Sequence, residues 1–136
     1  MSVKFNIVGR FGNSGIDLEG TAASLRELSE RIGAIRGHET FELNIPSVPP
    51  SPYSGYLRSL QIDVCEGNVR ISRDDDCIYV AGSAGKLAIL ASNMASLASQ
   101  KSSFSSEHSH IEYYPGHFYL TEGSEPLVLT RRAPIA

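Results

Sequence analysis

Apolar and polar residues alternate in several short stretches of the chain, a pattern that is typical of half-buried strands. The first two stretches cover residues 3–7 and 16–20, and the Gly-Asn-Ser-Gly sequence at residues 12–15 lies between them. Because this composition favours a tight turn, we expect a hairpin over residues 3–20. Similar alternation predicts further strands at residues 41–45, 56–66, 69–73, 77–82, 108–114, 118–120 and 127–130.

A different spacing, with apolar residues three or four positions apart, predicts two amphipathic helices. The first begins after Thr21, whose hydroxyl suits an N-cap, and Gly37 marks its expected end. The second covers residues 84–99, with Ser83 as its cap and Lys86 as its only charged residue. Helices with so little charge are usually buried on more than one side, so we interpret it as a central helix, with a homo-oligomer interface as the alternative. The apolar stripes are Leu25, Leu28, Ile32 and Ile35 in the first helix and Leu87, Leu90, Met94 and Leu97 in the second.

Proline positions and short connections set the expected topology. Four prolines lie within residues 46–52, so this stretch is predicted to be a surface loop inside the domain. Hairpin turns are expected at residues 66–68 and 74–76, and such short connections join antiparallel strands. The sequence therefore predicts one α+β domain over residues 1–136, built on a mostly antiparallel sheet of about six to eight strands with two helices on one face.

The composition excludes several classes of protein. The 136 residues are 41% hydrophobic and 20% charged, which excludes a disordered tail and a coiled coil. A net charge of -3 gives no reason to expect binding to nucleic acid or to a membrane. The chain has no apolar run of about 18 residues and no signal-peptide pattern at its start, so we expect a cytoplasmic protein. Two cysteines, Cys65 and Cys77, are too few for a disulfide framework or a zinc cage.

Three of the four histidines lie close together near the C-terminal end of the chain. Alternation in the strand predicted there places His108, His110, Glu112 and Tyr114 on one face and Ile111 on the other. Residues two apart on a strand lie about 7 Å from each other, a spacing that two ligands of one divalent metal can accommodate. His108, His110 and Glu112 are therefore an alternative metal site, but a polar, hydrogen-bonded sheet face is the favoured interpretation.

Other catalytic patterns are weaker. The many serines do not form a Gly-x-Ser-x-Gly elbow, and residues 82–86 lack the spacing of a phosphate-binding P-loop. Cys65 has no local base beside it and fits a packing role, while the three aspartates at residues 74–76 fit a solvated turn better than a cation site. We therefore predict neither an enzyme nor a cofactor.

The C-terminal segment carries a more specific pattern. The run His-Ser-His-Ile-Glu-Tyr-Tyr-Pro-Gly-His-Phe-Tyr-Leu at residues 108–120, followed by Ser-Glu-Pro-Leu-Val-Leu at residues 124–129, resembles the signature of the Immunity protein 32 family. The resemblance covers residues 107–130, and a helix around residues 25–35 is compatible with it. Members of this family are short α+β proteins of bacterial polymorphic toxin systems, are encoded beside a toxin gene, and are inferred to neutralise that toxin.

The resemblance implies binding of a cognate toxin rather than turnover of a substrate. An inhibitor of this kind needs a rigid scaffold and an exposed, complementary face, and tyrosine and histidine suit such a face because they combine apolar area with a polar tip. Tyr53 and Tyr56 form a second candidate contact, for which anchoring of the adjacent proline-rich loop is the equal alternative. The contact residues that we expect are His108, His110, Glu112, Tyr114 and His117.

Overall fold

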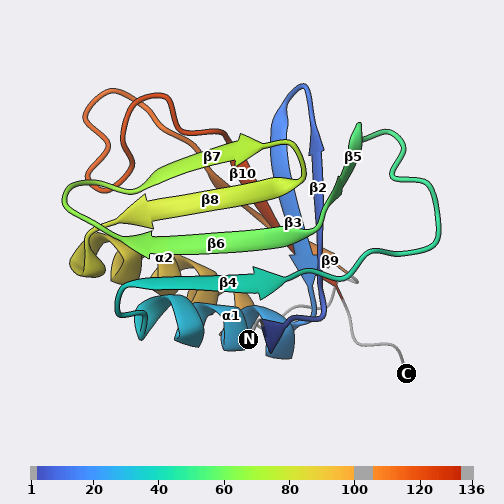
Figure 1. The fold of residues 1–136 in the computed structure, drawn as a ribbon, viewed down its shortest axis with the longest axis horizontal. Coiled ribbons are helices and arrows are strands. Elements are labelled where there is room, and N and C mark those ends of the chain that lie inside the picture. Colours follow the sequence, from blue (N-terminus) through green and yellow to red (C-terminus); the bar gives the residue numbers. More distant parts are fainter. Residues whose placement is uncertain (1–2, 100–105, 133–136) are drawn as a thin grey trace.

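The computed structural model describes residues 3–99 and 106–132, which form two five-stranded sheets and two helices (Figure 1). The strand order of the first sheet is β1 (Val3–Lys4), β4 (His38–Glu42), β6 (Ser59–Val64), β8 (Cys77–Gly82) and β7 (Arg70–Asp74). The order of the second is β5 (Gly55–Leu57), β2 (Ile7–Gly12), β3 (Gly15–Gly20), β10 (Leu127–Arg132) and β9 (Ser106–Ile111). The helices are α1 (Ala22–Gly33) and α2 (Ala84–Ser99).

The α+β class is confirmed, but the strands divide between two sheets instead of forming one sheet of six to eight strands. The predicted strand at residues 56–66 is two strands, since the chain leaves the second sheet at Leu57 and enters the first at Ser59. The predicted strand at residues 3–7 is likewise shared between β1 and β2. Alternation continues through a corner where a strand changes sheets, so the pattern does not reveal the break.

Strand pairing is mixed, with five of the eight pairs antiparallel. The predicted N-terminal hairpin is present as β2–β3, but its first strand is residues 7–12 instead of 3–7. The β7–β8 hairpin is confirmed, with Asp75 at a φ of 54° in its turn. The predicted hairpin at residues 66–68 is wrong, because β8 lies between β6 and β7 and pairs with β6 in parallel. β10 enters the second sheet parallel to β3 and antiparallel to β9.

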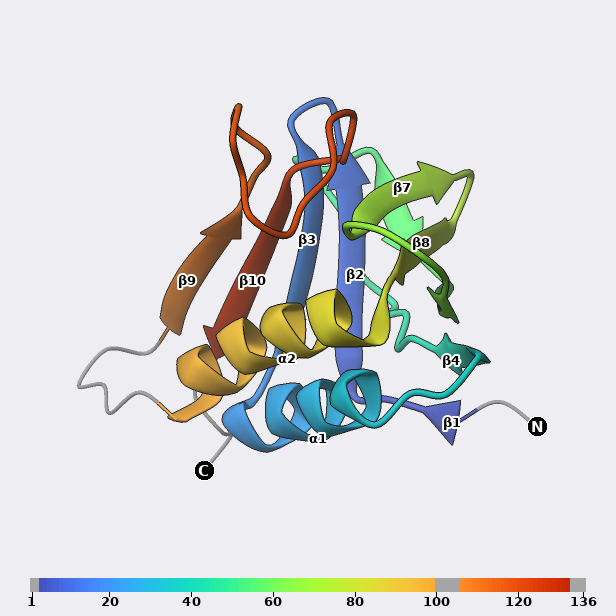
Figure 2. The ribbon, with the colours of Figure 1, turned by 90° about the vertical axis from the view of Figure 1, so that its left-hand side faces the viewer.

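Both helices begin where their caps predict. Thr21 Oγ1 accepts a hydrogen bond from Ser24 N at 3.2 Å, and Ser83 Oγ accepts one from Lys86 N at 3.2 Å. The first helix ends at its C-cap Ala34, before the predicted Gly37. The helices pack against each other and lie on one face of the second sheet (Figure 2).

One hydrophobic cluster joins the helices to both sheets. The predicted stripe of α2 is fully part of it, since Leu87, Leu90, Met94 and Leu97 are all buried. This supports the central-helix interpretation and leaves those four side chains unavailable to a second copy of the chain. Neither helix in the described residues is long and apolar enough to span a bilayer.

The predicted return strand at residues 118–120 is instead part of a segment that follows the edge of the first sheet. Thr121 N donates to Val69 O at 2.8 Å, and Glu125 N donates to Ile71 O at 2.7 Å. Leu120 forms a single parallel bridge with Val69. The long loop between β9 and β10 therefore covers the backbone edge at β7.

Candidate functional site

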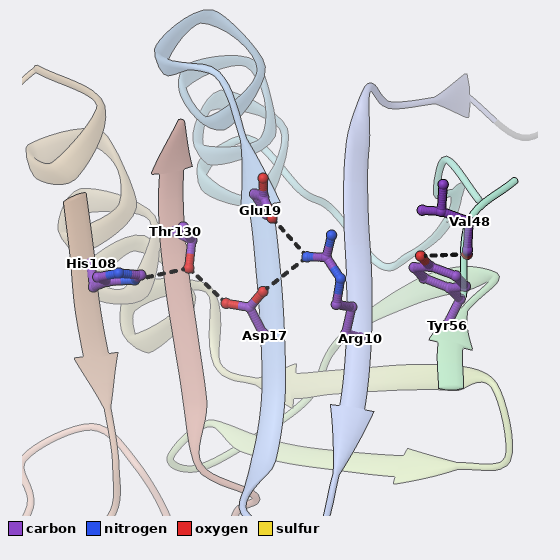
Figure 3. Close-up of polar contacts among 7 residues, drawn as sticks. All are labelled: Arg10, Asp17, Glu19, Val48, Tyr56, His108 and Thr130. Carbon is purple, nitrogen blue, oxygen red and sulfur yellow. Dashed lines mark hydrogen bonds and ion pairs between the residues drawn. The ribbon is translucent and has the colours of Figure 1, made fainter. Parts of the chain in front are cut away.

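Polar side chains gather on the face of the second sheet that is turned away from the helices. Cross-strand pairing places Arg10 of β2 opposite Asp17 of β3. Thr130 of β10 pairs with Glu19 of β3 on one side and with His108 of β9 on the other. Residues opposite each other share a face of the sheet, so the five side chains lie together (Figure 3). We call these five residues the polar face.

A chain of hydrogen bonds connects the polar face across four strands (Figure 3). Thr130 Oγ1 donates to Asp17 Oδ1 at 2.7 Å and lies 3.1 Å from His108 Nδ1. Because the single hydroxyl proton goes to Asp17, His108 Nδ1 is the donor in its contact with Thr130. Neutral His108 is therefore the Nδ1–H tautomer, which leaves Nε2 as an acceptor.

Arg10 lies at the other end of this series of hydrogen bonds. Its Nη1 lies 2.7 Å from Glu19 Oε1 and 3.3 Å from Asp17 Oδ2. Burial by itself would lower the pKa of Arg10, but the hydrogen bond and the charge of Glu19 raise it above its ordinary value. The guanidinium is therefore held in its charged form between two carboxylates.

Asp17 is the buried centre of the polar face, with 5% of its surface exposed. Burial raises the pKa of Asp17 above its ordinary value, against the hydrogen bond from Thr130 and the charge of Arg10, which lower it. The two partners thus compensate the carboxylate for only part of its lost hydration.

Aromatic rings and the proline-rich loop border the polar face. The Cζ atom of Arg10 lies 6.0 Å from the ring centroid of Tyr53 and 5.9 Å from that of Tyr56. The Tyr56 hydroxyl donates to Val48 O at 2.9 Å, so this tyrosine anchors the loop to β5 (Figure 3). A hollow of about 330 Å³ lies over the face, and Pro52 and Tyr53 form part of its wall.

Two of the predicted contact residues lie on the same side of the second sheet. His108 and His110 of β9 are both exposed and pair with Thr130 and Val128 of β10. Ile111 is buried on the opposite side, as the alternation predicts. The first part of the predicted histidine face is therefore present.

The prediction that Glu112 and Tyr114 continue this face is wrong. β9 ends at Ile111, opposite Leu127, the first residue of β10. Pro126 precedes that residue and has no N–H to extend the ladder, so the chain leaves the sheet there. Both side chains are exposed, but they lie beyond the strand.

Residues 112–119 form a loop with five rings in contact, which we call the aromatic loop. His117 lies at its centre, with ring centroids 6.5 Å from Tyr113, 4.6 Å from Tyr114, 5.7 Å from Phe118 and 4.6 Å from Tyr119. Tyr114 is 50% exposed and Phe118 is 59% exposed. Two large aromatic side chains are therefore presented to solvent on a packed base.

His117 fixes the backbone of this loop. Its Nδ1 accepts hydrogen bonds from Tyr119 N at 3.2 Å and from Leu120 N at 3.0 Å. A nitrogen that accepts two hydrogen bonds carries no proton, and burial lowers the pKa of His117. The loop is therefore built around a neutral imidazole.

Helix α2 holds the aromatic loop in place. Lys86 Nζ donates to Phe118 O at 2.7 Å, and Asn93 Nδ2 donates to the Tyr119 hydroxyl at 2.7 Å. Tyr119 is buried, and burial raises the pKa of its hydroxyl. The exposed rings thus stand on a rigid base, which reduces the entropy lost when a partner binds them.

The C-terminal part of the chain, which contains the aromatic loop and two of the five polar-face residues, matches a known family. Residues 78–132 match the family model of Immunity protein 32. The match runs from β8 through α2, β9 and the aromatic loop to β10, and it confirms the resemblance seen at residues 107–130. No curated protein and no solved structure matches the chain.

The matched segment, residues 78–132, contains all five predicted contact residues. Among residues 3–99 and 106–132, no group of three His, Cys, Asp or Glu side chains is arranged to hold a metal ion. His108, His110 and Glu112, the alternative metal ligands, do not form such a group, because β9 ends before Glu112.

The matched segment supplies only Thr130 and His108 of the polar face, and the sequence analysis did not identify the other three residues. Arg10, Asp17 and Glu19 come from β2 and β3, outside the matched residues. Opposite charges on facing strands of the predicted hairpin were a usable signal, because a turn at residues 13–14 sets Arg10 opposite Asp17. Thr130 carried no such signal, since its partner lies 113 positions away.

Proposed function

We propose that this protein is an immunity protein that neutralises a cognate bacterial toxin by stoichiometric binding in the cytoplasm. The observation that carries the proposal is the Immunity protein 32 match over residues 78–132. A family of this kind implies a toxin as partner and a role without catalysis. The protein would then need no cofactor, and its effect would depend on occupancy of the toxin.

The aromatic loop supports this proposal as a contact surface. Interface energy is concentrated in a few aromatic and arginine side chains that are held rigidly and become fully buried on binding. Tyr114 and Phe118 are exposed on a base fixed by His117 and α2. We propose that these two rings enter apolar pockets of the toxin, and that His110 and Glu112 contribute polar contacts beside them.

Capture of the toxin tests the proposal. The bait is this protein, and the prey is the product of the adjacent gene with its toxic domain disabled by mutation. We expect a complex with one copy of each protein, measured by light scattering and isothermal titration. Co-expression should also restore growth of cells that make the active toxin. A folded bait that neither binds this prey nor protects cells would contradict the proposal.

Substitutions at the surface test the role of the aromatic loop. Tyr114→Ala and Phe118→Ala should each weaken binding about tenfold or more, which corresponds to the contribution of an interface anchor. Val48→Ala is the matched control, because Val48 is 61% exposed and lies in the proline-rich loop. If Tyr114→Ala and Phe118→Ala weaken binding no more than Val48→Ala does, the toxin does not contact the aromatic loop.

A further inference from the structure

The polar face has more hydrogen-bond acceptors than donors left for a partner. The Thr130 hydroxyl proton goes to Asp17, and the Nδ1 proton of His108 goes to Thr130. His108 Nε2 is then an acceptor that points away from the chain of bonds. A carboxylate has about four acceptor positions, and Glu19 uses one of them on Arg10. The remaining capacity of the face suits a group that donates hydrogen bonds.

The charge balance favours a cation. Asp17 and Glu19 carry two negative charges against the one positive charge of Arg10, so the five residues named above together hold one net negative charge when His108 is neutral. Arg10 pairs with both carboxylates, at 2.7 Å from Glu19 and 3.3 Å from Asp17, so one of the two negative charges is left unbalanced within this group. A partner with a positive group would restore neutrality in a partly buried place, where unpaired charge is costly.

The shape of the hollow limits the size of that group. Its volume of about 330 Å³ lies at the lower end of the range of about 300–1,000 Å³ that ligand clefts occupy. Tyr53 and Pro52 form an apolar wall, with Glu19 and His108 among the other lining residues. A guanidinium fits such a place because it can bind a carboxylate through two N–H groups and stack its flat face on an aromatic ring.

We propose that the polar face is a socket for an arginine side chain of the toxin, with Glu19 as its carboxylate partner and His108 Nε2 as a second acceptor. The socket rests on the proposed function, since the arginine belongs to the neutralised toxin. It also explains how the N-terminal hairpin, which lies outside the Immunity protein 32 match, takes part in recognition.

The test measures affinity of the complete protein for the disabled toxin by isothermal titration. Glu19→Gln keeps the size of the side chain and an oxygen for Arg10 but removes the charge, and we expect about a tenfold loss of affinity. The loss should shrink at high salt, where charge attraction is screened. Glu42→Gln is the control, because Glu42 is an exposed carboxylate on the first sheet.

A pair of substitutions at His108 tests the second acceptor. One of them keeps the contact between residue 108 and Thr130. His108→Asn places an amide near the position of Nδ1, so it can still contact Thr130, but it has no atom at the position of Nε2. His108→Gln places an amide near Nε2. We expect the first variant to bind several-fold more weakly than the second. Since His108 is exposed, both variants should fold, which their melting temperatures will verify.

The outcomes separate the socket from the proposed function. Wild-type binding with a selective loss in Glu19→Gln and His108→Asn supports the socket. Wild-type binding that neither substitution weakens beyond Glu42→Gln overturns the socket and leaves the immunity function in place. Failure of the wild-type protein to bind the toxin overturns the function, and the socket with it.

Discussion

Thr130 and Asp17 are joined by a hydrogen bond of 2.7 Å, although 113 positions separate them in the sequence. Both residues are buried, and the bond connects residues 78–132, which match the Immunity protein 32 model, to the N-terminal hairpin. A buried carboxylate that accepts a hydrogen bond from a hydroxyl group depends on that donor, because water cannot take the place of the donor unless the surrounding structure rearranges. The free energy of unfolding that is lost when this bond is removed therefore measures its contribution to holding the two parts of the chain together.

We predict that Thr130→Val destabilises the protein by about 1–3 kcal/mol, since it leaves the Asp17 carboxylate without its closest donor. Valine keeps the shape of threonine, so little of the loss comes from packing. The free energy of unfolding in urea measures the effect. Thr40→Val, at a partly exposed position of β4, should change it by less than about 0.5 kcal/mol. Equal shifts in the two variants would contradict the assigned role of the bond.

Arg10→Met is expected to destabilise the protein in a pH-dependent way. At pH 7 the loss should be about 2 kcal/mol, less than the value of about 3–5 kcal/mol for a fully buried pair, because Arg10 is partly exposed. Burial already raises the pKa of Asp17, and loss of the Arg10 charge raises it further. A group with a raised folded-state pKa adds stability as the pH falls through that pKa. The difference between variant and wild type should therefore shrink between pH 7 and pH 4.5, and a constant difference would refute this account.

Protonation of His117 should lower the stability of the folded protein in mild acid. Burial lowers its folded-state pKa below the ordinary value of 6.5, so the unfolded chain takes up the proton first. The contribution of neutral His117 is complete above about pH 6.5 and is lost as the pH falls through the lower folded-state pKa. His117→Asn keeps an acceptor for the two backbone N–H groups but cannot titrate. Between pH 7.5 and pH 5 the melting temperature of this variant should fall less than that of the wild type.

Two glycines should respond to alanine in opposite directions. Gly15 has a φ of +128°, and an added Cβ would lie 2.4 Å from Pro126 O, so Gly15→Ala should cost more than about 1 kcal/mol. Gly85 in α2 has no atom within 4 Å of an added Cβ, and Gly85→Ala should gain about 0.5 kcal/mol from helix propensity. Chemical denaturation of the two variants beside the wild type tests the pair, and stabilisation by Gly15→Ala would show that the hairpin and β10 are less tightly packed.

The local elements could be predicted from the sequence because their signals are local. Caps at Thr21 and Ser83 and the stripe spacing located both helices, and turn residues located two hairpins. The division into two sheets could not be predicted, since a strand keeps its alternation when it turns a corner at Arg58. The parallel pair of β6 and β8 was also out of reach, because only the packed sheet brings those strands together.

The candidate site divides in the same way. His108 and His110 were placed on one strand face by alternation, which β9 bears out. Alternation placed Glu112 and Tyr114 on the same face, which is wrong because Pro126, just before the neighbouring strand β10, ends the ladder. The sequence did not identify β10 as the partner of β9. The packing of His117 against four rings depends on the path of a loop, which no periodic pattern specifies.

β10 is the last described strand to leave the ribosome, yet it occupies the fourth position in a five-stranded sheet. Until it arrives, β3 keeps an open edge and Leu18 lacks the neighbour Leu129 that covers it. We expect the nascent chain to remain incompletely folded through most of its synthesis and to offer an exposed strand edge to chaperones or to other chains. Many contacts join distant parts of the sequence, so the final step should also be slow for a protein of this size. If the protein has the proposed immunity function, the cell would have to synthesise it before the toxin acts, because a molecule without β10 lacks Thr130 and the pairing that holds His108 beside it.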